Sequence, residues 1–336
     1  MSRQGAELKP PWSAVPREIK ERAAEILGAP VVRAHRVYGG YAPSATFRLV
    51  LANGRRAFFK SSYPLPKGSG TIWVLDREAA NYRRLQRYIN PWAPRFFGTF
   101  EQDGWHVLLL EDLGPRSVPP WTPATTRRAA RSYARFHKRT VGKPLPRWLS
   151  REPYLAHARF WRALSSSGEL AGTASLAGAN ADDAREWIDV ALPILIEQER
   201  ALERARPPHA LLHFDTRSDN VRVMRDRLRI FDWPFASIGP AEFDVVAFCQ
   251  TVEAERGPSV ERVLAWYEEV LRLRSAMIDA SLAGITGYFA DRSWRPPISG
   301  LPRLRPWQRA QLKVCVAWCA RRFELPDPRW LTAVKS

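Results

Sequence analysis

Apolar and polar residues alternate over much of the first third of the chain, which is the pattern of strands with one buried face. Asn53-Gly54 separates two such runs, and Asn-Gly between alternating runs is a strong hairpin signal. Residues Glu101–Gly104 separate two more. The pattern predicts an antiparallel sheet from these strands: Val31–Tyr38, Ala45–Leu51, Arg56–Lys60, Arg95–Phe100 and Trp105–Leu110.

Two helices are predicted among these strands. The first covers residues 13–28, with Ser13 as its capping residue and Gly28 at its end. The second begins near Ile72 and stops at Pro91, because proline cannot continue a helix. Its apolar stripe, flanked by Glu78, consists of Leu75, Ala79, Tyr82, Leu85 and Ile89.

Helical periodicity predominates after the break at Leu113–Pro115. We therefore place a boundary between residues 1–113 and residues 114–336. Residues 165–177 are small and polar, which predicts a loop or a mobile cap. Helices are predicted over 123–140, 182–204 and 245–251, and from Ser259, Met277 and Arg309.

A polar loop between apolar segments carries the candidate chemistry. Residues 211–220 contain His213, Asp215 and Asn220, and two short apolar runs follow, split by the turn Arg225-Asp226. These runs predict a β-hairpin whose second strand ends on Asp232. A hairpin folds back on itself, so Asp232 is expected close to Asn220, with Asp215 one loop turn away. Converging carboxylates and an amide suit Mg²⁺ beside a base.

The spacing His-x-Asp-x-x-x-x-Asn, with an aspartate twelve residues after the asparagine, resembles the catalytic core of the protein-kinase-like superfamily. It is most similar to the aminoglycoside phosphotransferase family of small-molecule kinases. Phe214 replaces the arginine that anchors an activation loop, and about a dozen residues separate Asp232 from Asp244, with no A-P-E motif. That leaves almost no room for a peptide platform. The resemblance implies an α+β, two-lobed kinase-like fold, with an N-terminal antiparallel sheet, one main helix and a larger, mostly helical C-terminal lobe.

The resemblance also implies ATP and Mg²⁺ as cofactors and assigns roles to the polar loop. Asp215 would accept or orient the proton of the acceptor hydroxyl, and Asn220 and Asp232 would hold Mg²⁺. Arg217 would stabilise the γ-phosphoryl group, unless it pairs with Asp219 instead. His213 would hold the loop backbone.

In the N-terminal lobe, the resemblance implies that Lys60 binds the α- and β-phosphates. Glu78 would hold its ammonium, although a helical arginine, Arg77 or Arg83, is an alternative partner. Gly39 and Gly40 would approach phosphates, or they form only a turn. Glu111, Asp112 and Leu113 would contact the base through main-chain groups. Asp244 would support the polar loop from behind, or it is an N-terminal helix carboxylate favoured by the helix dipole.

Composition adds a strong positive charge to this picture. Lys and Arg outnumber Asp and Glu by 52 to 34, which gives a net charge of +18. This surplus is either a solvated arginine-rich surface or a means of attracting anions. No nucleic-acid-binding signature accompanies it. Three cysteines without a CxxC pair, no apolar leader and no run of membrane-span length indicate the cytoplasm.

The sequence thus predicts ATP-dependent phosphorylation of a hydroxyl on a small molecule: a sugar, an amino alcohol or an aminoglycoside-like antibiotic. The alternatives are a catalytically silent kinase-like module and an anion- or nucleic-acid-binding protein. The net charge would repel polycationic acceptors unless their pocket is acidic. Candidate carboxylates for such a pocket, which solvated helix faces also explain, are Glu253, Glu255, Asp279 and Asp291.

Overall fold

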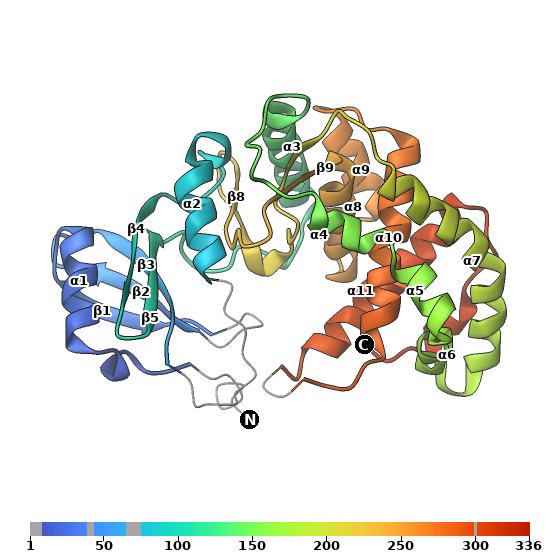
Figure 1. The fold of residues 1–336 in the computed structure, drawn as a ribbon, viewed down its shortest axis with the longest axis horizontal. Helices are drawn as coiled ribbons and strands as arrows, with labels where there is room; N and C mark the ends of the chain where they lie inside the picture. The colour runs from blue at the N-terminus through green and yellow to red at the C-terminus, as the bar shows by residue number, and fades with distance from the viewer. Residues whose placement is uncertain (1–8, 39–43, 65–74, 299–300) are drawn as a thin grey trace.

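The computed structural model of the chain describes residues 9–38, 44–64, 75–298 and 301–336. An antiparallel five-stranded sheet forms the small lobe, with the order β1-β2-β3-β5-β4 (Figure 1). The predicted alternation and both predicted hairpins are confirmed. The strands are β1 (Val31–Arg36), β2 (Ala45–Leu51), β3 (Arg56–Ser62), β4 (Phe96–Gln102) and β5 (Trp105–Glu111).

One face of this sheet packs on helix α1 (Arg17–Leu27). Phe47 and Leu49 of β2 are fully buried there together with Ile19 of the helix. Gly28 ends α1 with a left-handed φ of 74°, as predicted. The predicted capping role of Ser13 is wrong. Ser13 lies in the short 3-10 helix η2 (Trp12–Ala14), and Pro16, whose φ is fixed near the helical value, occupies the N-cap.

Helix α2 (Leu75–Ile89) lies between this sheet and the larger lobe (Figure 1). Its buried stripe, including Tyr82 and Leu85, packs with Leu108 and Leu110 of β5 into the same hydrophobic core as the helical lobe. The helix therefore couples the two lobes. The division at residues 113 and 114 stays a prediction.

The larger lobe is mostly helical and is centred on α10 (Ser275–Ser293), which packs against α7, α8 and α11. Leu282 and Ala283 of α10 have no exposed surface. None of the helices in the described ranges is long and apolar enough to cross a membrane. The other helices are α3 (Pro123–Thr140), α4 (Glu152–His157), α5 (Phe160–Ser167), α6 (Leu170–Ala174), α7 (Ala181–Glu203), α8 (Ala241–Ala254), α9 (Val260–Glu268) and α11 (Leu304–Arg322), with short 3-10 helices η3 (Ser175–Asn180), η4 (Ser218–Asn220) and η5 (Arg329–Ala333).

The loop or mobile cap predicted over 165–177 is wrong, because α5, α6 and η3 run through these residues. Gly172 lies so close to Trp294 that a Cβ atom there would overlap its ring. The Thr173 hydroxyl donates to the carbonyl of Ala290 on α10 at 3.0 Å. The small residues thus permit close helix packing, which a single-chain pattern does not distinguish from a loop.

The predicted hairpin is confirmed as β7 (Val221–Val223) and β8 (Leu228–Ile230), with Val221 opposite Ile230. Phe231 N–H donates to the Asn220 carbonyl at 2.9 Å, which extends the pairing to the ends of both strands. A second short ladder joins β6 (Ala210–Leu212) to β9 (Ser237–Gly239). The ladder between β6 and β9 brings the two ends of the segment 213–236 together, and the hairpin of β7 and β8 lies within this segment. The predicted two-lobed fold is confirmed.

Candidate active site

A cavity of about 700 Å³ lies between the sheet and the β7–β8 hairpin. Its walls include Lys60 from β3, Glu78 from α2, and Asp215, Asn220 and Asp232 from the segments flanking the hairpin. Five polar residues that the sequence singled out therefore meet in one cleft, although the first and last are 172 positions apart.

Lys60 joins the two lobes electrostatically. Its Nζ lies 2.6 Å from Oε2 of Glu78 and 2.9 Å from Oδ1 of Asp232. Glu78 is only 1% exposed, and its partner is Lys60, one of the two alternatives that the sequence left open. The lysine is thus held by one carboxylate from the sheet side and one from the hairpin side.

The ionisation of these three groups is coupled through their charges. Burial is the largest influence on Glu78 and raises its pKa. The charge of Lys60 opposes this rise, and the charge of Asp232 adds to it. Burial alone would lower the pKa of Lys60, but the two carboxylates outweigh it and raise the pKa. Burial would raise the pKa of Asp232, but Lys60 outweighs it and lowers the pKa. At neutral pH the lysine and Asp232 are therefore both charged.

Asn220 is fixed by Asp215. Its Nδ2 donates to the main-chain oxygen and to Oδ2 of Asp215, both at 2.9 Å. An amide has one donor end and one acceptor end, so these bonds leave Oδ1 as the oxygen available to a cation. Together with Asp232, this fits the oxygen ligands that Mg²⁺ prefers. No cluster of three or more His, Cys, Asp or Glu suited to a metal occurs in the described ranges, so oxygen ligands from water or phosphate would complete such a site.

The backbone of the polar loop is held from behind by Asp244, which has no exposed surface. Its carboxylate accepts hydrogen bonds from the N–H groups of His213, at 2.6 Å, and Phe214, at 2.8 Å. The ring of His213 contacts the Phe231 carbonyl (3.0 Å) and accepts from the N–H of Asp215 (3.3 Å), so it bridges the loop to the hairpin.

Phe214 and Asp232 both have left-handed backbone conformations, with φ of 77° and 68°. Non-glycine residues rarely adopt such angles, and the cost is about 1–3 kcal/mol each. The hydrogen bond from Phe214 N–H to Asp244 holds the first of these positions. Strain in both segments that flank the hairpin indicates that the side chains there are positioned by surrounding contacts.

Arg217 lies against Asp215, with Nε 3.4 Å from Oδ1. Its guanidinium also sits over the ring of Trp307 on α11, 5.6 Å from the centroid. The carboxylate of Asp219, the alternative partner considered from the sequence, pairs with Arg116. Arg217 is therefore directed towards the carboxylate expected to meet the acceptor hydroxyl.

The segment Glu111–Leu113 also lines the cleft. The carboxylate of Glu111 accepts a hydrogen bond from Arg229 at 2.5 Å. Asp112 Oδ1 accepts from the N–H of Gly114 at 2.9 Å, and Gly114 has a φ of 77°, so the chain turns sharply here. The predicted base-contacting segment thus lies in the cleft, while Gly39 and Gly40 fall outside the described residues.

Two arginines that the sequence did not single out also line the cleft. Arg48 and Arg222 both donate to the carbonyl of Gly114, the latter at 3.3 Å. Burial lowers the pKa of Arg222 to about 10, and the charges of Arg48 and Arg116 add to this effect. Alternation along β2 carried a signal for Arg48, because Arg48 is two residues after Thr46, which is paired with Lys60.

The candidate carboxylates for a cationic acceptor are held by donors of the chain itself. Their role in binding a cationic acceptor stays a prediction. The contacts are Glu253 with the N–H of Val260, Glu255 with Trp121 and Ser218, Asp279 with Arg322, and Asp291 with Arg292 and Arg295.

Similar folds occur in several kinases. A candidate fructosamine-3-kinase from Thermobifida fusca is 21% identical, with a TM-score of 0.52, and the match covers 88% of this chain and 98% of that one. Spectinomycin phosphotransferase, in complex with ADP and spectinomycin, is 13% identical (TM-score 0.58; 90% and 98% covered). Choline kinase LicA from Streptococcus pneumoniae is 12% identical (TM-score 0.54; 90% and 98% covered). At these identities the likeness establishes the fold alone.

None of the curated proteins matches the chain. The sequence profile of the phosphotransferase enzyme family, designated APH, matches residues 36–277, which is well over half of the chain. This range contains Lys60, Glu78, the polar loop and Asp232. The chain therefore belongs to the phosphotransferase enzyme family.

Proposed function

We propose that this protein transfers the γ-phosphoryl group of ATP to a hydroxyl of a small molecule. The observation that carries this proposal is the convergence of Lys60, Glu78, Asp215, Asn220 and Asp232 in one cleft. Use of a nucleotide is supported by similar folds that contain one, such as spectinomycin phosphotransferase with ADP and an amicoumacin kinase with AMP-PNP and Ca²⁺.

The small lobe, residues 1–113, would bind the nucleotide, and residues 114–336 would supply the polar loop and the acceptor pocket. Lys60 would neutralise the α- and β-phosphates while Glu78 holds its ammonium. The main chain of Glu111–Leu113 would contact the base, and Gly39-Gly40 would approach the phosphates. The γ-phosphate would then lie near Asp215, which lines the same cleft.

Asn220 and Asp232 would hold Mg²⁺. When bound, the ion would neutralise charge on the phosphates during transfer. The orientation of the Asn220 amide and the lowered pKa of Asp232 both favour this role, because they present an amide oxygen and an ionised carboxylate.

Asp215 would orient the acceptor hydroxyl and take its proton. The hydroxyl oxygen forms a bond to the γ-phosphorus as the bond to the bridging oxygen breaks, and ADP leaves with that electron pair. Arg217, 3.4 Å from Asp215, would bind the transferring phosphoryl group through its planar fork. Most of the rate enhancement would come from positioning and charge stabilisation, as is usual for phosphoryl transfer.

The acceptor would be a small hydroxylated molecule: a sugar, an amino alcohol or an aminoglycoside-like antibiotic. Asp279 and Asp291 are paired with arginines, whereas Glu253 and Glu255 accept hydrogen bonds from uncharged donors.

An ATP-consumption screen over hydroxylated metabolites tests the proposal, with Asp215→Asn as the blank. The matched control is Asp226→Asn, because Asp226 lies in the hairpin turn and pairs with Arg227 at the surface. We expect Asp215→Asn to lower turnover by orders of magnitude while ATP binding persists, and Asp226→Asn to behave as wild type. Near-wild-type turnover in Asp215→Asn would contradict the assignment.

A further inference from the structure

A second carboxylate, besides that of Asp244, contacts the polar loop. Glu255 follows α8 directly and occupies its C-cap position. One oxygen, Oε1, accepts a hydrogen bond from the hydroxyl of Ser218 at 2.5 Å, and the other, Oε2, accepts from Nε1 of Trp121 at 2.7 Å. Both partners are buried, with 3% and 4% of their surface exposed. Glu255 therefore joins the polar loop to the segment between β5 and α3.

The helix alone does not favour a carboxylate at this position. The C-terminal end of a helix carries a partial negative charge, which favours cations and disfavours anions. The last turn of α8 contains no basic residue, and Glu253 lies two residues before Glu255. A hydrogen bond that an ionised carboxylate accepts is stronger than one between neutral groups. The contacts with Ser218 and Trp121 therefore offset a placement that the helix itself disfavours.

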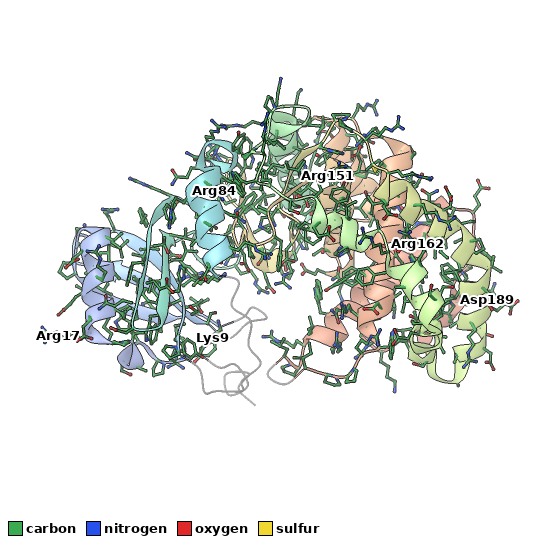
Figure 2. All side chains as sticks on the ribbon, viewed as in Figure 1. Lys9, Arg17, Arg84, Arg151, Arg162 and Asp189 are labelled. Carbon is green, nitrogen blue, oxygen red and sulfur yellow. The ribbon has the colours of Figure 1, made fainter. Side chains whose placement is uncertain are left out.

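The chain around Glu255 is fixed by close packing. Arg256 has a left-handed φ of 63°, which non-glycine residues rarely adopt. The N–H of Gly257 donates to the carbonyl of Val252 at 2.9 Å, and a Cβ atom on Gly257 would lie 2.7 Å from the Cβ of Trp121. Side chains crowd this part of the helical lobe, where α3, α8 and α9 meet (Figure 2). The carboxylate is therefore presented to the polar loop from a well-packed turn.

Ser218 is the first residue of η4, the single turn that ends on Asn220. The N–H of Asn220 donates to the carbonyl of Arg217 at 2.9 Å, which closes this turn. A turn of three residues has few contacts of its own, so its placement depends on what holds its two ends. Asn220 is held by Asp215, and Ser218 is held by Glu255. Displacement of Ser218 would therefore also move the amide oxygen proposed to bind Mg²⁺.

The segment between β5 and α3 contacts the same turn at a second point. The side chain of Arg116, in this segment, pairs with Asp219, the middle residue of η4. Trp121, which donates to Glu255, lies five residues further along the segment. The segment begins directly after Glu111–Leu113, the residues proposed to contact the base. These contacts therefore connect the turn that carries the proposed metal ligand to the part of the chain proposed to hold the nucleotide.

We infer that Glu255 is a positioning residue of the phosphotransfer site, which fixes Ser218, and with it Asn220, relative to the segment that follows Glu111–Leu113. The inference rests on the proposed function and adds to it a residue that acts through the polar loop. Groups that orient a metal ligand raise the affinity of the site for the metal. The loss of Glu255 should therefore affect the part of ATP binding that depends on Mg²⁺.

Calorimetric titration of the full-length chain with ATP, once with Mg²⁺ and once with EDTA, tests this inference. We expect Glu255→Ala to weaken ATP binding in the presence of Mg²⁺ about tenfold, as the loss of a group that orients a metal ligand does. ATP binding in EDTA should not change. Glu255→Gln should keep most of the Mg²⁺-dependent affinity, because its amide oxygen can accept from Trp121 while its NH₂ group donates to Ser218.

Two further variants separate positioning from a general effect on the fold. Ser218→Ala should weaken Mg²⁺-dependent binding as Glu255→Ala does, and the double variant should bind no more weakly, because both residues act through one contact. The control is Glu268→Ala. Glu268 is the last residue of α9 and accepts the N–H of Leu273 at 3.2 Å, so this variant removes a comparable contact at the end of another helix. It should bind ATP as the wild type does.

The outcomes separate this inference from the proposed function. Wild-type affinity in Glu255→Ala, or an equal loss with Mg²⁺ and with EDTA, would overturn the role of Glu255 and leave the nucleotide site intact. A wild-type protein that binds no ATP, or binds it equally well with Mg²⁺ and with EDTA, would overturn the proposed nucleotide or metal site and the role of Glu255 with it. Thermal melting of each variant identifies a loss that comes from misfolding. Ser218→Ala, which removes only a hydroxyl, still decides the matter if Glu255→Ala does not fold.

Discussion

We expect replacement of Asp244 by asparagine to destabilise the protein and to disorganise the polar loop. The Asp244 carboxylate is completely buried and accepts the N–H groups of His213 and Phe214 and the hydroxyl of Tyr133. Asparagine has the same shape but turns one acceptor oxygen into an NH₂ donor. Because both carboxylate oxygens accept a backbone N–H, at least one of these donors would lose its acceptor.

The structure sets the size of this effect. A buried donor left unsatisfied costs about 1–3 kcal/mol, and a hydrogen bond to a charged group contributes about 1.5–3 kcal/mol. We therefore expect Asp244→Asn to lower the free energy of unfolding by about 3–5 kcal/mol, as when a buried charged partner is removed. Turnover should also fall, since Phe214 would no longer be held at a φ of 77° and Asp215 follows it directly.

Urea unfolding, followed by tryptophan fluorescence, measures this loss. Asp226→Asn is the control and should remain within about 0.5 kcal/mol of wild type, because Asp226 is largely exposed. Equal stability of Asp244→Asn and wild type at neutral pH would refute the reasoning.

The difference in unfolding free energy between wild type and Asp244→Asn should depend on pH. Burial acts to raise the pKa of Asp244, but hydrogen bonds from His137 and Tyr133 outweigh it and hold the pKa below its ordinary value. The stabilisation is therefore present above the unfolded pKa of about 3.9 and is lost as the pH falls through the folded pKa. The gap between wild type and Asp244→Asn should close in acid.

Two further predictions concern other parts of the site. Glu78→Gln should lower ATP-dependent turnover by roughly a hundredfold, because Lys60 loses a carboxylate that positions it and a small misplacement of a binding group can cost that much. Glu101→Gln is the control in the steady-state assays. Equal turnover of Glu78→Gln and wild type would argue against a role for the Lys60–Glu78 pair. Burial lowers the pKa of His157 to about 4. The unfolded chain takes up this proton below about pH 6.5, so stability should fall from pH 6.5 towards 4. We expect His157→Phe to remove this part of the pH dependence, which urea unfolding midpoints at pH 7 and pH 5 would measure. An equal loss of stability between these pH values in the variant and in the wild type would contradict the prediction.

Local patterns were sufficient to predict the hairpin side of the site. Asn220 and Asp232 flank two short strands, and a two-stranded ladder leaves its ends adjacent whatever the rest of the fold does. Alternation likewise identified the strand that ends near Lys60. These predictions succeeded because each depends on contacts between residues that are close in sequence.

The remaining features depend on contacts that no local pattern encodes. Gly172 is small because Trp294, far along the chain, lies against it, so the sequence there resembled a loop. The ladder between β6 and β9 has three residues in each strand, too few for a visible alternation. Lys9 precedes the first helix and reaches the cleft through a contact with Thr46 of β2, which no local pattern predicts.

The positions of the ion-paired carboxylates help to interpret the surplus of positive charge. In the helical lobe, Glu242, Glu269 and Asp291 each pair with arginines, so many acidic groups there are neutralised locally. In the cleft, burial is the main cause of the lowered pKa of Arg222, and the charges of Arg48 and Arg116 add to it. Lys9 and Lys60 line the same cavity. The cleft also contains carboxylates, among them Glu78, Asp215 and Asp232, so its walls carry both signs of charge. Because Lys60 is paired with two of these carboxylates, the net charge of the chain does not by itself identify the cleft as a site for polyanions.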